Sequence, residues 1–269
     1  MKYFLIAITQ AFVVFASAQS EGPYRTSKAT GYLAKPAQVQ FDQELLKKIK
    51  VPEGFKVSVF AKDLDGPRMM VVDLDNNVYV SRPNTGDILI LRDTNKDGVA
   101  DDRQVYVKDF DKVHGMAISG PLFYFVALKK VYVTNLKKEE SKVTTKSAVR
   151  TLIENLPDVG QHENRSMAIG PDGKIYISIA SNCNSCLDPN KLMATMQVAN
   201  LDGTEMKTFA SGLRDTIGFD WHPDTKQMYG MDHGTDWLGD DLPREELNLL
   251  VQGKNYGWPF CWNEKNVDW

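Results

Sequence analysis

The sequence predicts an all-β fold, a β-propeller, on three observations. A unit recurs four times, and each copy has a leading polar residue, an apolar strand, a turn and a second apolar strand. The leading residues, at Arg68, His114, His162 and Arg214, are 46, 48 and 52 positions apart. No segment carries a long apolar repeat of 3.6 residues, which an amphipathic helix would show. A period of about 40–50 residues with short strands is typical of propeller blades.

Strands and turns follow the same order in every repeat. The third repeat places strands at 165–169 and 175–177 around a Pro-Asp-Gly turn. The other strand pairs are predicted at 68–73 and 78–80, at 114–118 and 122–126, and at 218–221 and 228–229. A β-sandwich also has many short strands, but it does not require a polar residue before one strand of each repeat. In a propeller the innermost strands line a central channel, so we expect the leading residues to converge there.

The chain is predicted to have three parts. Residues 1–18 have a basic start, an apolar run and the small residues Ala16 and Ala18, which indicates a signal peptide. A membrane anchor is the alternative, but the apolar run is shorter than the roughly 20 residues that a span needs. Residues 19–50 form an N-terminal arm, and residues 51–269 form the propeller domain. The sequence 257–259 resembles the opening of another blade, so we expect about four blades plus the start of another, incomplete at the C-terminus.

Composition is that of an exported globular protein. Of 269 residues, 42% are hydrophobic and 25% are charged, and the net charge is -3 without a long basic block. These values argue against nucleic acid as a partner. With the signal peptide cleaved, no stretch is long enough to span a membrane, so we expect a periplasmic or secreted protein.

The three cysteines favour one local disulfide. Cys183 and Cys186 are the close pair, and export permits a disulfide between them. Two reduced thiols are the alternative. Leu187 stands where a haem-attachment motif needs histidine. Cys261 is left over: it is buried and inert, or its partner lies beyond this chain.

One loop matches a calcium-binding pattern. Asp93, Asn95, Asp97 and Asp101 stand at positions 1, 3, 5 and 9 of the loop, with glycine at position 6. Position 12 is Gln104 in place of the usual bidentate glutamate, which removes one charged ligand. A hairpin rich in Asp and Asn, without metal, is the alternative.

The polar residues expected in the channel carry acid–base and electrostatic chemistry. A histidine such as His114 or His162 acts as a base near neutral pH, and Arg165 or Arg214 beside it stabilises charge that develops on a carbonyl oxygen. Each histidine taken alone is more often structural. Asp215 follows the second arginine. The segment 232–241 offers backbone carbonyls and carboxylates for calcium, and an acidic surface loop without metal is its alternative.

Three motifs in order resemble the soluble quinoprotein glucose/sorbosone dehydrogenase family. They are QHENRSMAIGPDGKIY at 161–176, GLRD at 212–215 followed by Gly218, and ELNLL at 246–250 leading into GKNYGWP at 253–259. The Cys-Asn-Ser-Cys segment together with GDDLP at 239–243 is most similar to the sorbosone-type branch. The resemblance covers roughly residues 51–269.

The resemblance implies a six-bladed propeller that holds pyrroloquinoline quinone at the channel mouth beside a calcium ion. His162 matches the general base, and Arg214 matches the arginine that polarises the reacting quinone carbonyl. His114 and Asp215 match cofactor contacts, although relatives commonly carry asparagine at the second position. The backbone carbonyls of Gly234 and Thr235 match calcium ligands, with threonine where proline is usual.

The implied activity is oxidation of an aldose or related sugar. Hydride would pass to the quinone while histidine takes the hydroxyl proton, and an external acceptor would then receive the electrons. The first alternative is a non-catalytic propeller that binds a ligand or a protein, because this fold serves many functions. A sugar lactonase ranks last, because it needs more inward-facing carboxylates than the repeats supply.

Overall fold

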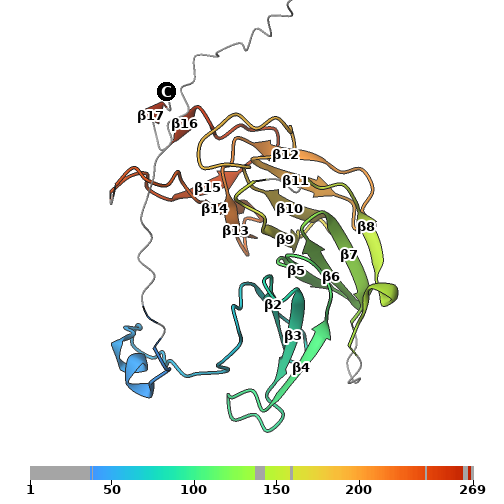
Figure 1. The fold of residues 1–269 in the computed structure, drawn as a ribbon, viewed down its shortest axis with the longest axis vertical. Helices are drawn as coiled ribbons and strands as arrows, with labels where there is room; N and C mark the ends of the chain where they lie inside the picture. Colours follow the sequence, from blue (N-terminus) through green and yellow to red (C-terminus); the bar gives the residue numbers. More distant parts are fainter. Residues whose placement is uncertain are drawn as a thin grey trace, which may run out of the picture.

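The computed structural model describes residues 37, 39–136, 143–157, 160–239, 241–262 and 266–267 (Figure 1). The predicted signal peptide and most of the predicted N-terminal arm lie outside these residues. Within the described part, no helix has the length and apolar character needed to cross a membrane. Helical structure there consists of two 3₁₀ segments, η1 (Gln43–Lys48) and η2 (Lys146–Ala148).

Four antiparallel sheets follow one another along the chain, and each connects its strands in sequence order. The first sheet contains β1 (Met70–Val72), β2 (Val78–Arg82), β3 (Asp87–Arg92) and β4 (Asp102–Val107). The second contains β5 (Met116–Ser119), β6 (Leu122–Ala127), β7 (Lys130–Asn135) and β8 (Arg150–Ile153). The third contains β9 (Arg165–Ile169), β10 (Ile175–Ile179), β11 (Thr195–Ala199) and β12 (Lys207–Ser211).

The fourth sheet has three strands, β13 (Thr216–Trp221), β14 (Met228–Asp232) and β15 (Glu246–Leu250). A short pair, β16 (Cys261–Trp262) and β17 (Asn266–Val267), follows. The first strands of neighbouring sheets lie against one another, β1 on β5, β5 on β9 and β9 on β13. Figure 1 shows β5, β9 and β13 toward the middle of the molecule and β8 and β12 at its periphery. The chain is therefore an all-β propeller with four blades, as the repeat predicts.

Apolar side chains between neighbouring blades hold the fold together. Tyr124 and Val126 of the second sheet pack with Ile177 and Ile179 of the third. Equivalent apolar clusters join the first sheet to the second and the third to the fourth. Two buried layers per blade explain why β3, β6 and β10 read as nearly continuous apolar runs in the sequence.

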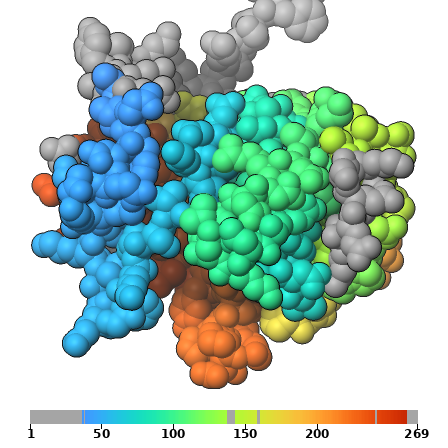
Figure 2. Space-filling model, turned by 90° about the horizontal axis from the view of Figure 1, so that it is seen from below, coloured from blue at the N-terminus to red at the C-terminus, as the bar shows by residue number. Residues whose placement is uncertain are grey.

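A segment from the N-terminal side covers the outer face of the first sheet. Phe60, Ala61 and Leu64 pack against a cluster made by Val80, Leu89 and Leu91. Figure 2 shows the chain before this segment, in blue, at the edge of the molecule beside the first sheets, in teal and green. The outer face of the first blade is thus closed by residues that form no strand of their own.

The leading polar residues of the repeats occupy three structural positions, where the sequence pattern predicts one. Counted back from the last paired residue of the innermost strand, His162 and Arg214 each stand seven residues earlier. Counted the same way, His114 stands five residues earlier and Arg68 four. A polar residue before an apolar run marks the approximate start of a strand. It does not determine how many residues lie between itself and the strand, because this number differs between blades.

Gly115 marks the closest approach between the second and third blades. A Cβ added there would lie 2.4 Å from the backbone nitrogen of Met167 and 2.7 Å from the carbonyl oxygen of Arg165. We expect Gly115→Ala to destabilise the protein by about 1–3 kcal/mol, because backbone must move to admit the methyl group. Thermal unfolding measures this, with Gly218→Ala as control, since a Cβ there has no heavy atom within 4 Å. Equal melting temperatures for the two variants would contradict the tight contact.

Candidate functional site

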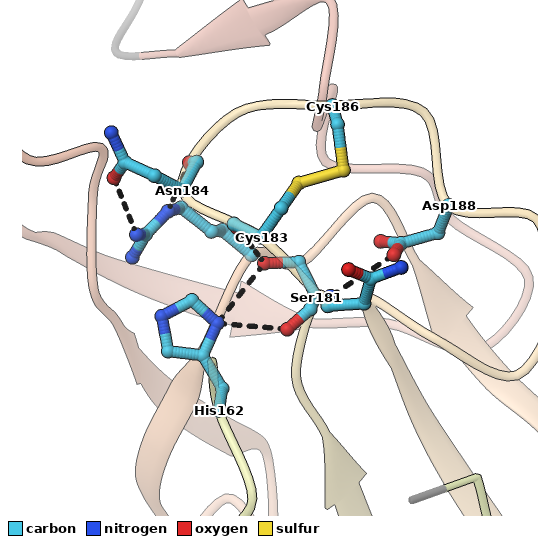
Figure 3. The surroundings of a disulfide bond; sticks show 8 residues. His162, Ser181, Cys183, Asn184, Cys186 and Asp188 are labelled. Carbon is cyan, nitrogen blue, oxygen red and sulfur yellow. Dashed lines mark hydrogen bonds between the residues drawn. A yellow bond between two sulfur atoms is a disulfide. The ribbon is translucent and has the colours of Figure 1, made fainter. Parts of the chain in front are cut away.

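His162 and Arg214 are attached to the same short segment after β10. The Nδ1 atom of His162 lies 2.8 Å from the carbonyl oxygen of Ser181. The Nε atom of Arg214 lies 2.9 Å from the carbonyl oxygen of Asn184, and the Ser181 backbone N–H donates to the Arg214 carbonyl at 2.6 Å. Figure 3 shows His162, Ser181 and Asn184 around the disulfide. The structure therefore brings together the two residues that the sequence analysis assigned to base and charge stabilisation.

The hydrogen bond of His162 defines which ring nitrogen carries the proton. A carbonyl oxygen accepts, so Nδ1 donates to Ser181, and in the neutral ring Nε2 keeps its lone pair. The Ser181 hydroxyl donates to the Cys183 carbonyl at 2.8 Å. This bond holds the segment 181–183, which carries the carbonyl that accepts from His162. The His162 ring is half-buried, so Nε2 belongs to a side chain that still has solvent-accessible surface. This is the tautomer and exposure that a general base needs.

Arg214 is a buried cation held mostly by neutral acceptors. Its side chain is 2% exposed, and its donors reach the Asn184 carbonyl, the Asn184 amide oxygen and the His233 carbonyl, each at 2.9 Å. Its ion pair with Asp236 spans 3.7 Å, against 2.6 Å for the pair between Arg92 and Asp102. Burial lowers the pKa of Arg214. Its hydrogen bonds go to neutral acceptors, and the carboxylates of Asp236, Asp215, Asp232 and Glu245 favour its charged form from nearby. A buried cation of this kind suits stabilisation of a developing negative oxygen.

Trp258 and a small cavity border the guanidinium. The guanidinium carbon of Arg214 lies 5.6 Å from the centroid of the Trp258 ring, a cation–π distance. A cavity of about 20 Å³ adjoins Arg214, Asp232, Thr235 and Trp258. That volume is too small for a ligand of quinone size, which occupies sites of several hundred Å³.

Two aspartates lie beside this pair. Burial raises the pKa of Asp215, while the charges of His162 and Arg214 act in the opposite direction. Burial also raises the pKa of Asp232 to about 6, although its carboxylate accepts the Thr216 hydroxyl and the backbone N–H groups of Arg214 and Asp215. Asp232 therefore fixes the backbone on which Arg214 stands, and the carboxylate of Asp215 lies within electrostatic reach of His162.

His114 occupies a different environment from His162. It is 2% exposed, and burial lowers its pKa to about 4, so the ring stays neutral at physiological pH. Its Nδ1 lies 3.1 Å from the carbonyl of Arg165, and its own blade thereby bonds to the third blade. Arg165 is 1% exposed and donates to the carbonyls of Pro157, His162 and Asn164. The two residues link blades and support the backbone that carries His162.

The cysteines differ in their state. Cys183 and Cys186 form the predicted disulfide, with a Cα–Cα distance of 6.1 Å (Figure 3). Cys261 is exposed and unpaired within the described chain. The alternative that this thiol is buried is therefore wrong. Cys261 lies after the fourth sheet, and its backbone N–H donates to the Gly257 carbonyl at 2.9 Å.

The predicted calcium loop is closed by its own hydrogen bonds. Asp93 accepts the backbone N–H groups of Asp97 and Gly98, and Asp101 accepts the hydroxyl of Thr94. Asn95 and Asp97 also bond within the loop. Among the described residues, no group of three or more His, Cys, Asp or Glu side chains is arranged to hold a metal ion. Calcium in this loop stays a prediction, and the metal-free Asp/Asn-rich hairpin accounts for every contact named here.

The second predicted calcium site lies beside Arg214. The Gly234 backbone N–H donates to Glu245 at 2.9 Å, and the ring of His233 lies 3.2 Å from the same carboxyl group. Thr235 is buried and lies next to Asp236, which bonds to Asn184. The proposed carbonyl ligands therefore belong to a segment that is tied to Arg214. Their role as calcium ligands stays a prediction.

The sequence analysis did not single out Asn184, Asp232 or Trp258 individually. Asn184 lies inside the close cysteine pair, and Asp232 begins the acidic segment that the analysis considered only as a source of metal ligands. Trp258 belongs to a motif that contributed to the family resemblance. A search for polar residues inside the disulfide loop would have found Asn184, because a three-residue separation leaves its side chain few directions.

Comparisons with known proteins identify relatives of this chain. A model of the TrAA12-like family matches residues 49–268. Quinoprotein glucose dehydrogenase B of Acinetobacter calcoaceticus is 24% identical over 255 residues, which cover 77% of this chain and 53% of that protein.

Solved structures show the same fold. The family AA12 carbohydrate-active enzyme of Trichoderma reesei superposes with a TM-score of 0.68 at 21% identity, covering 78% of this chain and 60% of that one. The quinone-binding (PQQ) domain of pyranose dehydrogenase from Coprinopsis cinerea, in its holo form, gives 0.66 at 18% identity, covering 79% and 58%.

This chain spans 53–60% of the length of these relatives. The resemblance to quinoprotein sugar dehydrogenases, indicated by three sequence motifs, is confirmed. Since the family model covers most of its residues, the chain belongs to the TrAA12-like family.

Proposed function

We propose that this chain carries the base and cation of a quinone-dependent sugar oxidoreductase that oxidises an aldose or related sugar. The observation that carries the proposal is the joint attachment of His162 and Arg214 to residues 181–184, with Nε2 of His162 left as an acceptor. Support also comes from the family match and from a relative whose name includes quinoprotein glucose dehydrogenase.

Pyrroloquinoline quinone, when bound, would supply the acceptor for the hydride that leaves the sugar carbon. The residues present fit such a group, because Arg214 is a buried cation whose ion pair with Asp236 spans 3.7 Å. We propose Arg214 and Asp215 as its contacts, with His114 supporting the site through its bond to the Arg165 carbonyl. Calcium is proposed at the backbone carbonyls of Gly234 and Thr235.

His162 would act directly on the substrate. Its Nε2 lone pair accepts the proton of the sugar hydroxyl as the C–H bond breaks, while Nδ1 holds the ring through its hydrogen bond to Ser181. The carboxyl group of Asp215 lies within electrostatic reach of this ring. Arg214 would hold the bound quinone with its positive charge and would stabilise negative charge that develops there.

We also propose export and an external electron acceptor. The proposal of export rests on the signal-like sequence of residues 1–18 and on the disulfide between Cys183 and Cys186, a bond that persists in oxidising compartments. An exported oxidoreductase must pass its electrons to an acceptor outside the cytoplasm.

The proposal is tested by reconstitution of the full chain. Pyrroloquinoline quinone is titrated into the protein with and without calcium, and quinone absorbance reports uptake. Dye reduction is then followed with several aldoses. We expect saturable quinone uptake that calcium strengthens, and dye reduction that depends on sugar. Absence of quinone uptake by folded protein would overturn the proposal and leave a propeller that binds some other ligand or a protein.

A further inference from the structure

The disulfide loop, residues 183–186, carries one side chain that contacts two parts of the candidate site. The amide oxygen of Asn184 accepts from Nη2 of Arg214 at 2.9 Å, and its backbone carbonyl accepts from Nε at 2.9 Å. These two bonds use adjacent donors on one edge of the guanidinium. Because a guanidinium is planar and its donors are rigid, two such bonds determine both its position and its plane.

The same side chain also fixes the segment after β14. Its amide oxygen accepts the backbone N–H of Asp236 at 2.7 Å, and its Nδ2 donates to the Asp236 carbonyl at 3.2 Å. Both contacts with Asp236 and the contact with Arg214 agree on which end of the amide is oxygen. Asp236 directly follows Gly234 and Thr235, the residues proposed to hold calcium. One asparagine therefore connects the cation of the site to the segment of the proposed metal.

Covalent and backbone constraints hold Asn184 in place. The disulfide joins the residue before it to Cys186. The Ser181 hydroxyl donates to the Cys183 carbonyl, and the Ser181 carbonyl accepts from His162. The loop thus sets the distance between His162, the proposed base, and Arg214, the proposed cation. These residues precede β9 and β13, which belong to different blades.

We propose that Asn184 is a positioning residue, which orients Arg214 and the segment 234–236 relative to His162, and that the disulfide serves to hold Asn184. The catalytic consequence rests on the proposed function, whereas the structural consequence does not. Without the amide, a buried guanidinium loses one neutral acceptor and the Asp236 backbone loses both partners. Arg214 then has freedom to turn toward the carboxylate of Asp236.

The test compares Asn184→Ala with Asn184→Asp, because a carboxylate retains oxygen acceptors for Arg214 and for the Asp236 N–H. Asn190→Ala is the matched control, since the oxygen of that exposed asparagine bonds to Leu192 N in its own turn. Two readouts are measured on the full chain: amide hydrogen exchange of the segment 233–238, and the dissociation constant for pyrroloquinoline quinone with calcium present.

We expect Asn184→Ala to accelerate exchange in 233–238 and to weaken quinone binding by roughly tenfold, the loss expected for one hydrogen bond to a charged group. Asn184→Asp should restore part of both values, because it keeps the oxygen acceptor but loses the Nδ2 donor to the Asp236 carbonyl, and Asn190→Ala should leave both unchanged. Cys183→Ser with Cys186→Ser should act in the same direction as the alanine variant. A rescue by aspartate distinguishes positioning from a general loss of folding.

Wild-type exchange and wild-type quinone affinity in Asn184→Ala would overturn the proposal. A variant that loses affinity without rescue by Asn184→Asp would overturn it as well. If the unaltered protein takes up no quinone, the proposed function fails, and the exchange measurement still decides whether Asn184 holds the segment 234–236. The two failures are therefore distinguishable.

Discussion

Replacing His162 with alanine is expected to lower sugar-dependent dye reduction by about 10²–10⁴-fold while quinone uptake is retained. The reason is that Nε2 is the lone-pair nitrogen of a ring held by its bond to Ser181. Alanine removes the proposed proton acceptor but neither of the proposed quinone contacts, Arg214 and Asp215. Steady-state dye reduction and quinone titration on the same preparation measure the two quantities separately.

His222→Ala is the matched control for this prediction. His222 lies in the turn between β13 and β14, at the end of the strand away from Arg214, where its Nδ1 accepts the backbone N–H groups of Asp224 and Thr225. Its loss should leave turnover unchanged. Added imidazole should restore part of the activity of His162→Ala by filling the space of the missing ring. Full turnover in His162→Ala would show that His162 is not the base.

The propeller fold was predictable because blade formation depends on local sequence. Each blade is a run of neighbouring antiparallel strands, so its apolar alternation and its Pro-Asp-Gly or Asn-Asn turns fall within one stretch of about 50 residues. The prediction for 165–169 coincides with β9, and Ile175 opens β10 as expected. Which residues of different blades are structurally equivalent is harder to predict. For example, β13 contains a register shift between Thr216 and Gly218 that apolar patterning does not reveal.

The candidate site was predictable in part for the same reason. His162 and Arg214 stand at the same distance from the ends of their inner strands, so the repeat itself marks both. Asn184 belongs to no repeat position. Its contacts with Arg214 and Asp236 join residues 30 and 52 positions apart, and such contacts depend on how blades pack. The environment of His114 likewise depends on packing, because the Arg165 carbonyl that it contacts belongs to the next blade.

Arg214→Lys is expected to lower sugar-dependent dye reduction by about 10²-fold, close to the loss seen when one charge-stabilising donor is removed from an active site. Lysine keeps the positive charge, but its single ammonium group cannot reach the carbonyls of both Asn184 and His233 with the geometry of a guanidinium. Arg214→Ala removes the charge as well, so its loss should be larger. Steady-state dye reduction at saturating quinone measures both variants.

Stability separates charge from packing in these two variants. Arg214→Ala leaves the part-buried carbonyls of Asn184 and His233 without their donor. This should cost up to about 1–3 kcal/mol for each group that water does not reach, and thermal unfolding detects it. Arg92→Lys is the control, because the ion pair of Arg92 with Asp102 is partly exposed and contributes little. If Arg214→Lys keeps full turnover, the positive charge alone suffices and the geometry set by Asn184 is not needed for the reaction. If Arg214→Ala also keeps full turnover, the electron-accepting site lies elsewhere. A residue that stabilises developing charge lowers the barrier of the step that generates this charge, so its removal must slow that step.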